Sequence, residues 1–402
     1  MANITIIIHD LRGGGAEKMM VRLANQLARG GDQVEIVLLG QGGSNKAFVN
    51  PDVTLVELGC ARTLQAFLPL RRHLSHSRPD AILAALTHVN VIVALTCWTL
   101  GMTKKLTVSE RNTFSQDRTL NTTLVMRFAY FLAPWIYRCL PNPVIAVSRG
   151  VADDLIACSA VRDKDVTTAP NPVITEETIQ ASNQSPRHPW LQQKSGKVVV
   201  AVGRLCHQKG FDLLLRAFAA LPDQADTRLI IFGEGELRSQ LEQQIIELGL
   251  SARVDLPGYT DNPLAEIKQA DLFVLSSRFE GSPNGLVEAM SVGTPVVAFD
   301  CPHGPREILL NDPKLFIKAE TGSEQQPTGQ INWEQPTEGS LVAYLDVAAL
   351  SHAMSNKLNH RYSQQLKQGI VESVQGFQAT LASAAYRKNL FARLPQGSEL
   401  CR

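Results

Sequence analysis

The feature that most constrains the fold is an alternation of short apolar runs with helical patterns, which occurs twice along the 402 residues. Between the runs, apolar residues recur about every four positions, as on one face of a helix. Such alternation predicts βαβ units, in which the strands are mostly parallel and helices separate them. The first series of runs comprises residues 4–9, 33–40, 53–59, 80–86, 105–110 and 143–148, and the second comprises 197–205, 227–235, 252–259, 271–277 and 294–300.

Two series of strands in a chain of this length predict two domains. We expect an N-terminal domain over residues 1–185, a C-terminal domain over 186–375 and a helical tail over 376–402 that packs back on the N-terminal domain. The predicted fold class is α/β, with two doubly wound, Rossmann-like domains that face each other across a cleft. Ligands of such sheets bind at the carboxyl ends of the strands, so we expect the site in that cleft.

Two polar stretches interrupt the pattern. Residues 175–196 are poorly periodic and are typical of a linker between the domains. Residues 319–340 are rich in Gln, Gly, Thr and Pro, which predicts a mobile surface loop before a helix that starts near Asp346.

Composition argues against several classes of protein. The formal net charge of +1 argues against a nucleic-acid footprint over the whole molecule. The seven cysteines are odd in number and never in CxxC spacing, which is typical of free thiols in a reducing compartment. The first residues, MANITIIIHD, lack the basic region of a signal peptide. We therefore expect a cytoplasmic protein.

One region is basic and aromatic. Residues 55–150 hold 11 Lys/Arg against 4 Asp/Glu and include Trp98 and Trp135. The longest apolar stretch, 124–140, is interrupted by two arginines and a proline, so it does not predict a transmembrane helix. Basic groups mixed with aromatic rings can hold a protein on the inner face of the plasma membrane as a peripheral protein. The alternative is a buried helix with solvated arginine ends, and both interpretations stay open.

Two glutamates flank a predicted helix N-terminus in the stretch EGSPNGLVEAMSVGTPVV. Pro283 would open the helix, Ser282 would cap it and Gly293 would close it. Glu280 then lies in the loop before the helix, and Glu288 lies in its second turn. Because free amides and the helix dipole favour an anion at this end, the arrangement suits a ligand with a central phosphate and hydroxyl groups at both ends.

Two further clusters follow predicted strands. HDLRGGGAEK places Gly13, Gly14 and Gly15 after the first strand, where glycines leave amides free for an anion, although many such turns need glycine for structural reasons alone. The spacing matches neither the dinucleotide pattern nor a Walker loop. In VGRLCHQKGF, Arg204 leaves a strand and Lys209 precedes a helix. This pair predicts a diphosphate site, the alternative being solvated charges beside a helix.

Together these motifs carry a resemblance. GRLxxxKG followed by Glu-x7-Glu within EGxPxxxxEAMxxGxPVV resembles the retaining glycosyltransferases of family 4, which have the GT-B fold, most closely over residues 197–307. The first half matches through its Gly-Gly-Ala-Glu turn, VIAVSRG and PNPV. DCPHGPREI and VSERN resemble a subgroup that builds bacterial lipid-linked glycans, lipopolysaccharide and other surface polysaccharides. Its members often transfer hexose or N-acetylhexosamine from a UDP-sugar.

The resemblance implies roles for the charged residues. Glu288 would bind the ribose hydroxyls and Glu280 the hydroxyls of the donor sugar. Arg204 and Lys209 would neutralise the diphosphate leaving group. His88, in LTHVN after the fourth strand, is a candidate for contact with the sugar, with a structural or solvent-facing role as the alternative.

The resemblance also implies contacts from the backbone. The amides of Asn284, Gly285 and Leu286 would hold the distal phosphate, and Gly14 and Gly15 of the first domain would close over it. The base would stack near FGEG, which contains Gly233 and Glu234, and near LPGY.

Retention in this family is usually explained by attack of the acceptor on the face that the leaving group departs from, which requires no protein nucleophile. Preorganised cations and amides stabilise the charge that builds on the departing nucleoside diphosphate. The DxD sequence at 163–165 is the metal signature of the other large glycosyltransferase fold, but it lies in a charged turn far from the expected cleft. Cys301 and His303 lack a complementary ligand set. We predict no cofactor and no metal requirement.

The leading interpretation is a retaining glycosyltransferase that uses a UDP-sugar and a lipid-linked or nascent polysaccharide acceptor. The alternative enzyme class is a GT-B-like nucleotide-sugar epimerase or phosphorylase. A Rossmann oxidoreductase would bind NAD(P), which the glycine spacing does not support. A binding module without catalysis would tend to lose one of the four charged groups, and all four are present.

Overall fold

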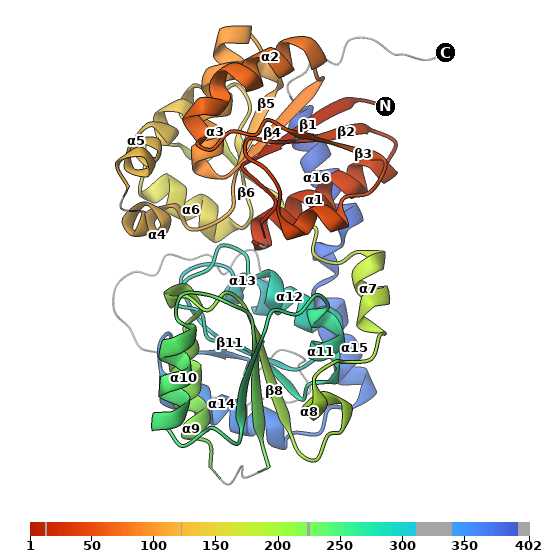
Figure 1. Ribbon diagram of the computed structural model, residues 1–402, viewed down its shortest axis with the longest axis vertical. Helices are drawn as coiled ribbons and strands as arrows, with labels where there is room; N and C mark the ends of the chain where they lie inside the picture. Colours follow the sequence, from red (N-terminus) through yellow and green to blue (C-terminus); the bar gives the residue numbers. More distant parts are fainter. Residues whose placement is uncertain (13, 122, 223–225, 311–339, 393–402) are drawn as a thin grey trace. The chain divides into compact units, whose positions relative to one another are not determined.

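A computed structural model describes residues 1–12, 14–121, 123–222, 226–310 and 340–392. It divides into two compact units. Unit 1 is Met1–Pro172 with Ala379–Arg402, and unit 2 is Val173–Gln378. Each unit is a parallel sheet with helices on its faces (Figure 1). The loop predicted at 319–340 lies, apart from its last residue, outside the described residues.

Unit 1 contains a seven-stranded sheet in the order β3-β2-β1-β4-β5-β6-β7, and every pair of neighbours is parallel. The order reverses between β1 and β4, which makes this the switch point where doubly wound sheets bind ligands. The strands are β1 Asn3–Ile8, β2 Gln33–Leu38, β3 Val53–Glu57, β4 Ala81–Ala85, β5 Leu106–Glu110, β6 Val144–Ala146 and β7 Val166–Thr168. The helices are α1 Gly15–Arg29, α2 Phe67–Ser77, α3 Thr87–Leu100, α4 Phe114–Leu120, α5 Leu124–Cys139, α6 Arg149–Ala157 and α16 Ala379–Leu390.

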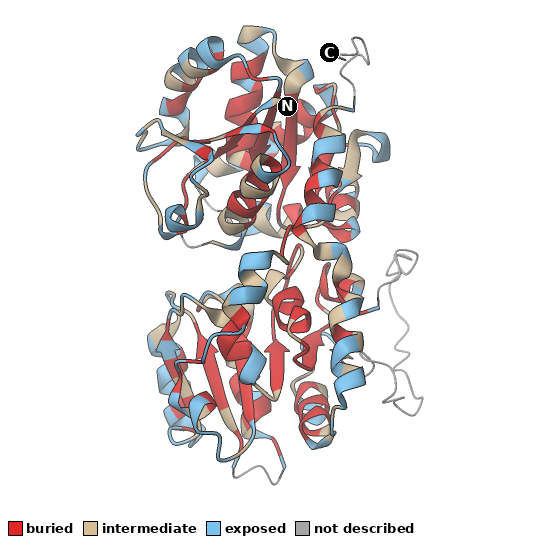
Figure 2. Ribbon diagram, turned by 90° about the vertical axis from the view of Figure 1, so that its right-hand side faces the viewer, coloured by how far each residue is buried: buried red, intermediate tan, exposed pale blue. Residues whose placement is uncertain are grey.

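Strand β1 shows why a largely apolar run forms a central strand. Ile4, Ile6 and Ile8 pack on the side of α1 and α16, whereas Ile7 packs on the side of α2, α3 and α5. Successive side chains of a strand point to opposite faces, so both faces of a sheet covered by helices require apolar residues. The central strands of both units are accordingly buried (Figure 2).

Unit 2 contains a six-stranded parallel sheet in the order β10-β9-β8-β11-β12-β13. Helices α9, α10 and α14 cover one face, and α11, α12 and α15 lie on the other (Figure 1). The strands are β8 Val198–Val202, β9 Arg228–Phe232, β10 Val254–Gly258, β11 Leu272–Leu275, β12 Val296–Phe299 and β13 Leu341–Val342. The helices are α7 Glu176–Ser182, α8 Pro189–Gln192, α9 Phe211–Ala219, α10 Arg238–Glu247, α11 Pro263–Gln269, α12 Asn284–Ser291, α13 Pro305–Leu310, α14 Val347–Asn359 and α15 Gln364–Ser373.

The stretch 175–196 is not the featureless linker that the sequence predicts, because it forms α7 and α8 and joins unit 2. Asn262 donates to the carbonyl of Ala181 at 2.8 Å, and Glu266 accepts from the amide of Arg187 at 2.8 Å. These contacts fix the segment to α11, and the division between units therefore falls at residues 172/173 and not near 185.

Helix α16, from the predicted C-terminal tail, lies in unit 1 beside α1. Its Arg387 donates to both carboxylate oxygens of Asp32, at 2.7 and 3.2 Å. Its Tyr386 is fully buried, and the phenol accepts a hydrogen bond from Arg111 at 2.5 Å. The last helix thus closes one face of the first sheet.

Candidate functional site

In unit 2, helix α12 begins at Asn284, one residue later than the sequence predicts. Pro283 itself occupies the N-cap position, and no side chain caps the helix, so the expected cap from Ser282 is wrong. Gly293 follows the helix with φ of +75°, a conformation that glycine adopts without strain and that ends the helix as predicted. Glu288 lies in the second turn and is buried, with 7% of its surface exposed.

Lys209 and Glu280 lie together in unit 2. The Lys209 ammonium is 2.6 Å from a carboxylate oxygen of Glu280, and the hydroxyl of Ser277 donates to the same oxygen at 2.6 Å. Glu280 is 6% exposed. A buried carboxylate with a cation and a hydroxyl beside it can exchange these partners for the hydroxyl groups of a sugar, because a sugar hydroxyl also donates a hydrogen bond to a carboxylate.

Arg278 fixes the loop that carries Lys209. Its guanidinium binds both carboxylate oxygens of Asp212, at 2.8 and 2.7 Å, and donates to the carbonyl of His207 at 3.0 Å. The Ser276 hydroxyl donates to the carbonyl of Lys209 at 2.9 Å. Burial opposes ionisation of Asp212, but the hydrogen bonds and charge of Arg278 outweigh it and hold the pKa of Asp212 below its usual value.

A glycine after Lys209 allows the two loops to approach. Gly210 has φ of +61°, and a Cβ placed there would lie 2.1 Å from the carbonyl oxygen of Ser276. Any other residue would push the loop that follows β8 away from the loop that follows β11. The K-G pair of the sequence motif therefore places the Lys209 cation next to Glu280.

The predicted phosphate-binding groups differ in exposure and in whether they are already hydrogen-bonded. Arg204 is exposed, and its side chain makes no hydrogen bond or ion pair within the described part of the chain. Asn284 and Gly285 form the first turn of α12, where amides lack helical partners. The amide of Leu286 instead donates to the carbonyl of Pro283 at 3.1 Å, because Pro283 takes the cap position. Leu286 is therefore not placed as the sequence predicts, with its amide open to a phosphate.

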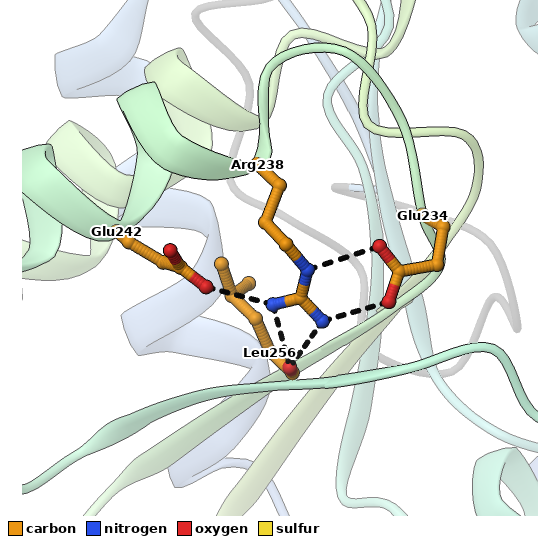
Figure 3. Close-up of polar contacts among 4 residues, drawn as sticks. All are labelled: Glu234, Arg238, Glu242 and Leu256. Carbon is orange, nitrogen blue, oxygen red and sulfur yellow. Dashed lines mark hydrogen bonds and ion pairs between the residues drawn. The ribbon is translucent and has the colours of Figure 1, made fainter.

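The region predicted to hold the base contains a guanidinium network (Figure 3). Arg238 donates to both carboxylate oxygens of Glu234, at 2.9 and 2.8 Å, to Glu242 at 2.8 Å and to the carbonyl of Leu256. The network ties the ends of β9 and β10 together. Gly233 is needed for close packing, since a Cβ there would lie 1.8 Å from the carbonyl oxygen of Gly203.

No group of three or more metal-ligating side chains occurs among the residues that the structure describes. The two acids of the DxD sequence are paired with arginines, Asp165 with Arg162 at 2.7 Å and Asp163 with Arg149 at 3.2 Å. Burial and then the charge of Glu280 raise the pKa of the Cys301 thiol, so this side chain remains protonated. That the protein needs neither metal nor cofactor stays a prediction.

In unit 1, the glycine turn precedes α1. Gly14 is the N-cap residue and its amide donates to the carbonyl of Arg12, whereas Gly15 is the exposed first residue of the helix. Gly13 lies outside the described residues. The Arg12 guanidinium binds Asp10. Burial opposes ionisation of Asp10, but Arg12 outweighs it and keeps the pKa of this carboxyl below its usual range.

His88 lies in the first turn of α3, with its ring centroid 5.4 Å from that of His9 in an edge-to-face arrangement. The turn before it is strained, because Leu86 has φ of +82° although it is not glycine. Burial, and then the charge of His9, lowers the pKa of His88 to about 4. The ring is therefore neutral near pH 7 and able to accept a proton or a hydrogen bond.

A buried polar network supports this turn. Glu110, at the end of β5, accepts hydrogen bonds from the hydroxyls of Thr87, at 2.9 Å, and Tyr137, and from the amide of Asn90 at 3.3 Å. Asn90 also donates to the phenol of Tyr137 at 3.0 Å. Burial raises the pKa of Glu110 to about 7 despite these hydrogen bonds.

Sequence reasoning missed several of these groups. The sequence motifs include His9, Asp10 and Glu110 but assign them no role, and they do not single out Asp212 or Arg278. His9 and Asp10 directly follow the first strand, which is a signal for a site residue at a parallel-sheet edge. Arg278 and Asp212 are separated by 66 positions, so only the fold brings them together.

Two family models match the chain in succession. The model described as Glycosyltransferase Family 4 matches residues 13–177, and the model described as Glycosyl transferases group 1 matches residues 184–332. Together they span most of the two units, and each lies almost wholly within one unit.

Curated relatives are also glycosyltransferases. An uncharacterized glycosyltransferase of Methanocaldococcus jannaschii is 42% identical over 125 residues, covering 31% of this chain and only 30% of that protein. A Campylobacter jejuni enzyme, N-acetylgalactosamine-N,N'-diacetylbacillosaminyl-diphospho-undecaprenol 4-alpha-N-acetylgalactosaminyltransferase, is 28% identical over 338 residues, covering 81% of this chain and 87% of the enzyme.

Solved structures share the fold. The Anabaena protein HepE, crystallised with UDP and glucose, superposes with a TM-score of 0.72 at 18% identity, covering 98% of this chain and all of HepE. At that identity the match establishes the fold, which is GT-B as the sequence predicts. With a parallel α/β sheet in each unit and both family models matched, the chain belongs to the group 1/family 4 glycosyltransferases and is a glycosyltransferase.

Proposed function

We propose that this glycosyltransferase moves a hexose or N-acetylhexosamine from a UDP-sugar to a lipid-linked or nascent polysaccharide acceptor, with retention of configuration. The observation that carries the proposal is the arrangement in unit 2, where the Lys209–Glu280 pair and buried Glu288 flank the start of α12. Cation, amides and two carboxylates are the groups that a diphosphate between a ribose and a sugar requires.

The acceptor class is drawn from the relatives. The Campylobacter enzyme described above is named for an acceptor linked to diphospho-undecaprenol, and a 33% identical Erwinia amylovora relative, covering 28% of this chain and 32% of that protein, is named for amylovoran biosynthesis. A UDP-sugar donor is supported by the UDP bound to HepE.

The proposed reaction needs no protein nucleophile. The bond between the anomeric carbon and the diphosphate oxygen breaks, and a bond from the acceptor oxygen to the same face of that carbon forms. The acceptor proton passes to the leaving diphosphate. Lys209 and Arg204 stabilise the negative charge on the leaving group, while Glu280 and Glu288 hold the sugar and the ribose. Neutral His88 would accept a hydrogen bond from a sugar hydroxyl.

The deciding experiment measures UDP release from a panel of UDP-sugars with and without a lipid-linked acceptor. Release that requires acceptor supports transfer, and product NMR showing the donor's anomeric configuration supports retention. Epimerisation without acceptor would support the alternative enzyme class. The same assay in excess EDTA tests the predicted metal independence, which loss of activity restored by manganese would refute.

The variant Glu288→Ala tests the nucleotide role directly. Because hydrogen bonds to a charged group contribute about 1.5–3 kcal/mol, we expect UDP to bind roughly tenfold to more than a hundredfold more weakly. Isothermal titration with UDP measures this without turnover. Wild-type affinity in the variant would remove Glu288 from the ribose site.

A further inference from the structure

Helix α5 is apolar on two opposite faces. Its inner face is buried in the core of unit 1 through Ala129, Tyr130, Ala133, Ile136 and Tyr137. Helices that are apolar all round are normally buried on every side. Here the outer face is exposed, which excludes the buried-helix alternative left open by the sequence.

The exposed side chains form a continuous stripe. Leu124, Phe128, Phe131 and Trp135 are 81, 62, 66 and 56% exposed, and their spacing of four, three and four residues places them on one line along the helix. A continuous row of exposed aromatic residues is uncommon on the surface of a soluble protein and marks an interaction site. We call these four residues the α5 stripe.

Neighbouring elements extend the stripe with the same character. Trp98 on α3, which packs against α5, is 41% exposed, and Leu120 at the end of α4 is 54% exposed. The charged side chains of the segment 118–139 are all positive. Residues 118–139 contain Arg118, Arg127 and Arg138 and no Asp, Glu or Lys, and all three arginines are exposed.

We propose that the α5 stripe docks on the surface of an anionic lipid bilayer. Phe and Trp rings prefer the boundary between headgroups and acyl chains, and arginines beside them pair with lipid phosphates. On a helical wheel, Arg127 and Arg138 fall on the same edge of the stripe, where they reach headgroups while the rings insert. None of the helices in the described part of the chain could span a membrane. In the proposed docking, α5 lies along the surface with its rings in the headgroup region.

Charge distinguishes this occupant from a second copy of the chain. A symmetric dimer through the stripe would bring the same residues of both copies together and would place arginines beside arginines, and residues 118–139 supply no carboxylate to pair with them. An anionic bilayer supplies the missing negative charge. The proposal rests on α5 alone and does not depend on the proposed transfer reaction.

Sedimentation with vesicles of phosphatidylglycerol and phosphatidylcholine tests the docking. We expect wild-type protein to bind phosphatidylglycerol vesicles, and the double variant Phe128→Ser/Phe131→Ser to bind at least tenfold more weakly. Ile246→Ser/Leu381→Ser is the matched control, because these side chains are exposed on other helices, at 64 and 54%. Its binding should equal that of wild type. Circular dichroism and thermal unfolding verify that both double variants fold.

The charge contribution is tested separately. Arg127→Gln/Arg138→Gln should weaken binding to phosphatidylglycerol and reduce its salt dependence, whereas Arg216→Gln/Arg361→Gln in unit 2 should do neither. Equal binding of wild type and the Phe128/Phe131 variant, or no binding of wild type to anionic vesicles, would overturn the proposal. So would self-association without lipid that this variant abolishes, because the stripe would then be a protein interface.

Discussion

The carboxylates near Lys209 in unit 2 and the buried carboxylate of Glu110 in unit 1 are held by different kinds of partner. In unit 2, Glu280 is paired with the Lys209 ammonium, and Asp212 with the Arg278 guanidinium. In unit 1, the hydrogen bonds to Glu110 come from hydroxyl and amide groups, which are neutral. The consequence is visible in the pKa values, since Arg278 keeps that of Asp212 low whereas burial raises that of Glu110 to about 7.

This difference suggests different roles for these two places in the fold. Opposite charges hold loops in place while remaining charged, which suits a site for an anionic leaving group. Neutral donors hold a carboxylate without bringing a cation to the site, and the proton on that carboxylate then depends on pH. The Lys209–Glu280 pair is therefore expected to be sensitive to the loss of a charge, and the Glu110 network to a change in pH.

The largest expected effect is that of Lys209→Met. The variant loses both the cation proposed to stabilise the leaving group and a charged partner of buried Glu280, so we expect turnover to fall roughly 10²–10³-fold. Initial rates of UDP release at saturating donor measure this. Lys367→Met, on the exposed surface of α15, is the control and should keep wild-type turnover. Wild-type turnover in the Lys209 variant would show that the charge pair has no role at the diphosphate.

The second effect is on stability. Arg278→Met leaves Asp212 without its guanidinium and frees the carbonyl of His207, so the free energy of unfolding should fall by about 1.5–3 kcal/mol near neutral pH. The folded pKa of Asp212 is depressed, so its contribution is present above the ordinary value of 3.8 and is lost as the pH falls through the folded value. Urea unfolding at pH 7 and pH 3 should show a gap between wild type and variant that narrows in acid. If the difference in unfolding free energy between wild type and variant does not change with pH, the lost stability comes from packing and not from the ion pair.

The fold could be predicted from the sequence because its signal is local. The run that forms β1 is apolar on both faces, and the Gly293 and Asp346 signals mark the end of α12 and the start of α14. The sequence does not reveal helix α7 because it is short and polar, and contacts with α11 help to stabilise it. Helical periodicity cannot reveal a helix that depends on a neighbour distant in sequence.

The candidate site could be predicted only in part. The Lys209–Glu280 pair was expected in one site because both residues follow strands of the same sheet. At Leu286 the amide donates to the carbonyl of Pro283, a hydrogen bond within the first turn that the sequence motif does not reveal. The Glu110 network could not be predicted, since Tyr137 lies 27 positions away and reaches Glu110 only after α5 packs on α3.

A third, smaller effect tests the neutral network in unit 1. The folded pKa of Glu110, about 7, lies above the ordinary 4.5. Its stabilising contribution is therefore complete below pH 4.5 and is lost as the pH rises through 7. Glu110→Gln cannot ionise, so its unfolding free energy should vary less between pH 4.5 and pH 8 than that of wild type. Glu372→Gln, an exposed control, should keep the wild-type slope. If the unfolding free energy changes equally with pH in all three proteins, a group other than Glu110 causes the pH dependence.

The smallest expected effect is a difference in titration between two histidines of unit 1. The hydrogen bond that His73 donates to Glu35, at 3.1 Å, raises the pKa of His73, whereas burial and then the charge of His9 lower that of His88 to about 4. Neutral His88 contributes to folding stability above pH 6.5, and this contribution is lost as the pH falls through 4. Charged His73 contributes to folding stability below pH 6.5, and this contribution is lost as the pH rises through its folded pKa. Imidazole proton shifts in NMR should thus remain constant for His88 between pH 5.5 and 8, while His73 is still protonated at pH 6.5. A His88 signal that titrates near pH 6.5 would mean that the ring is solvated, and the role proposed for it as a neutral acceptor would fail.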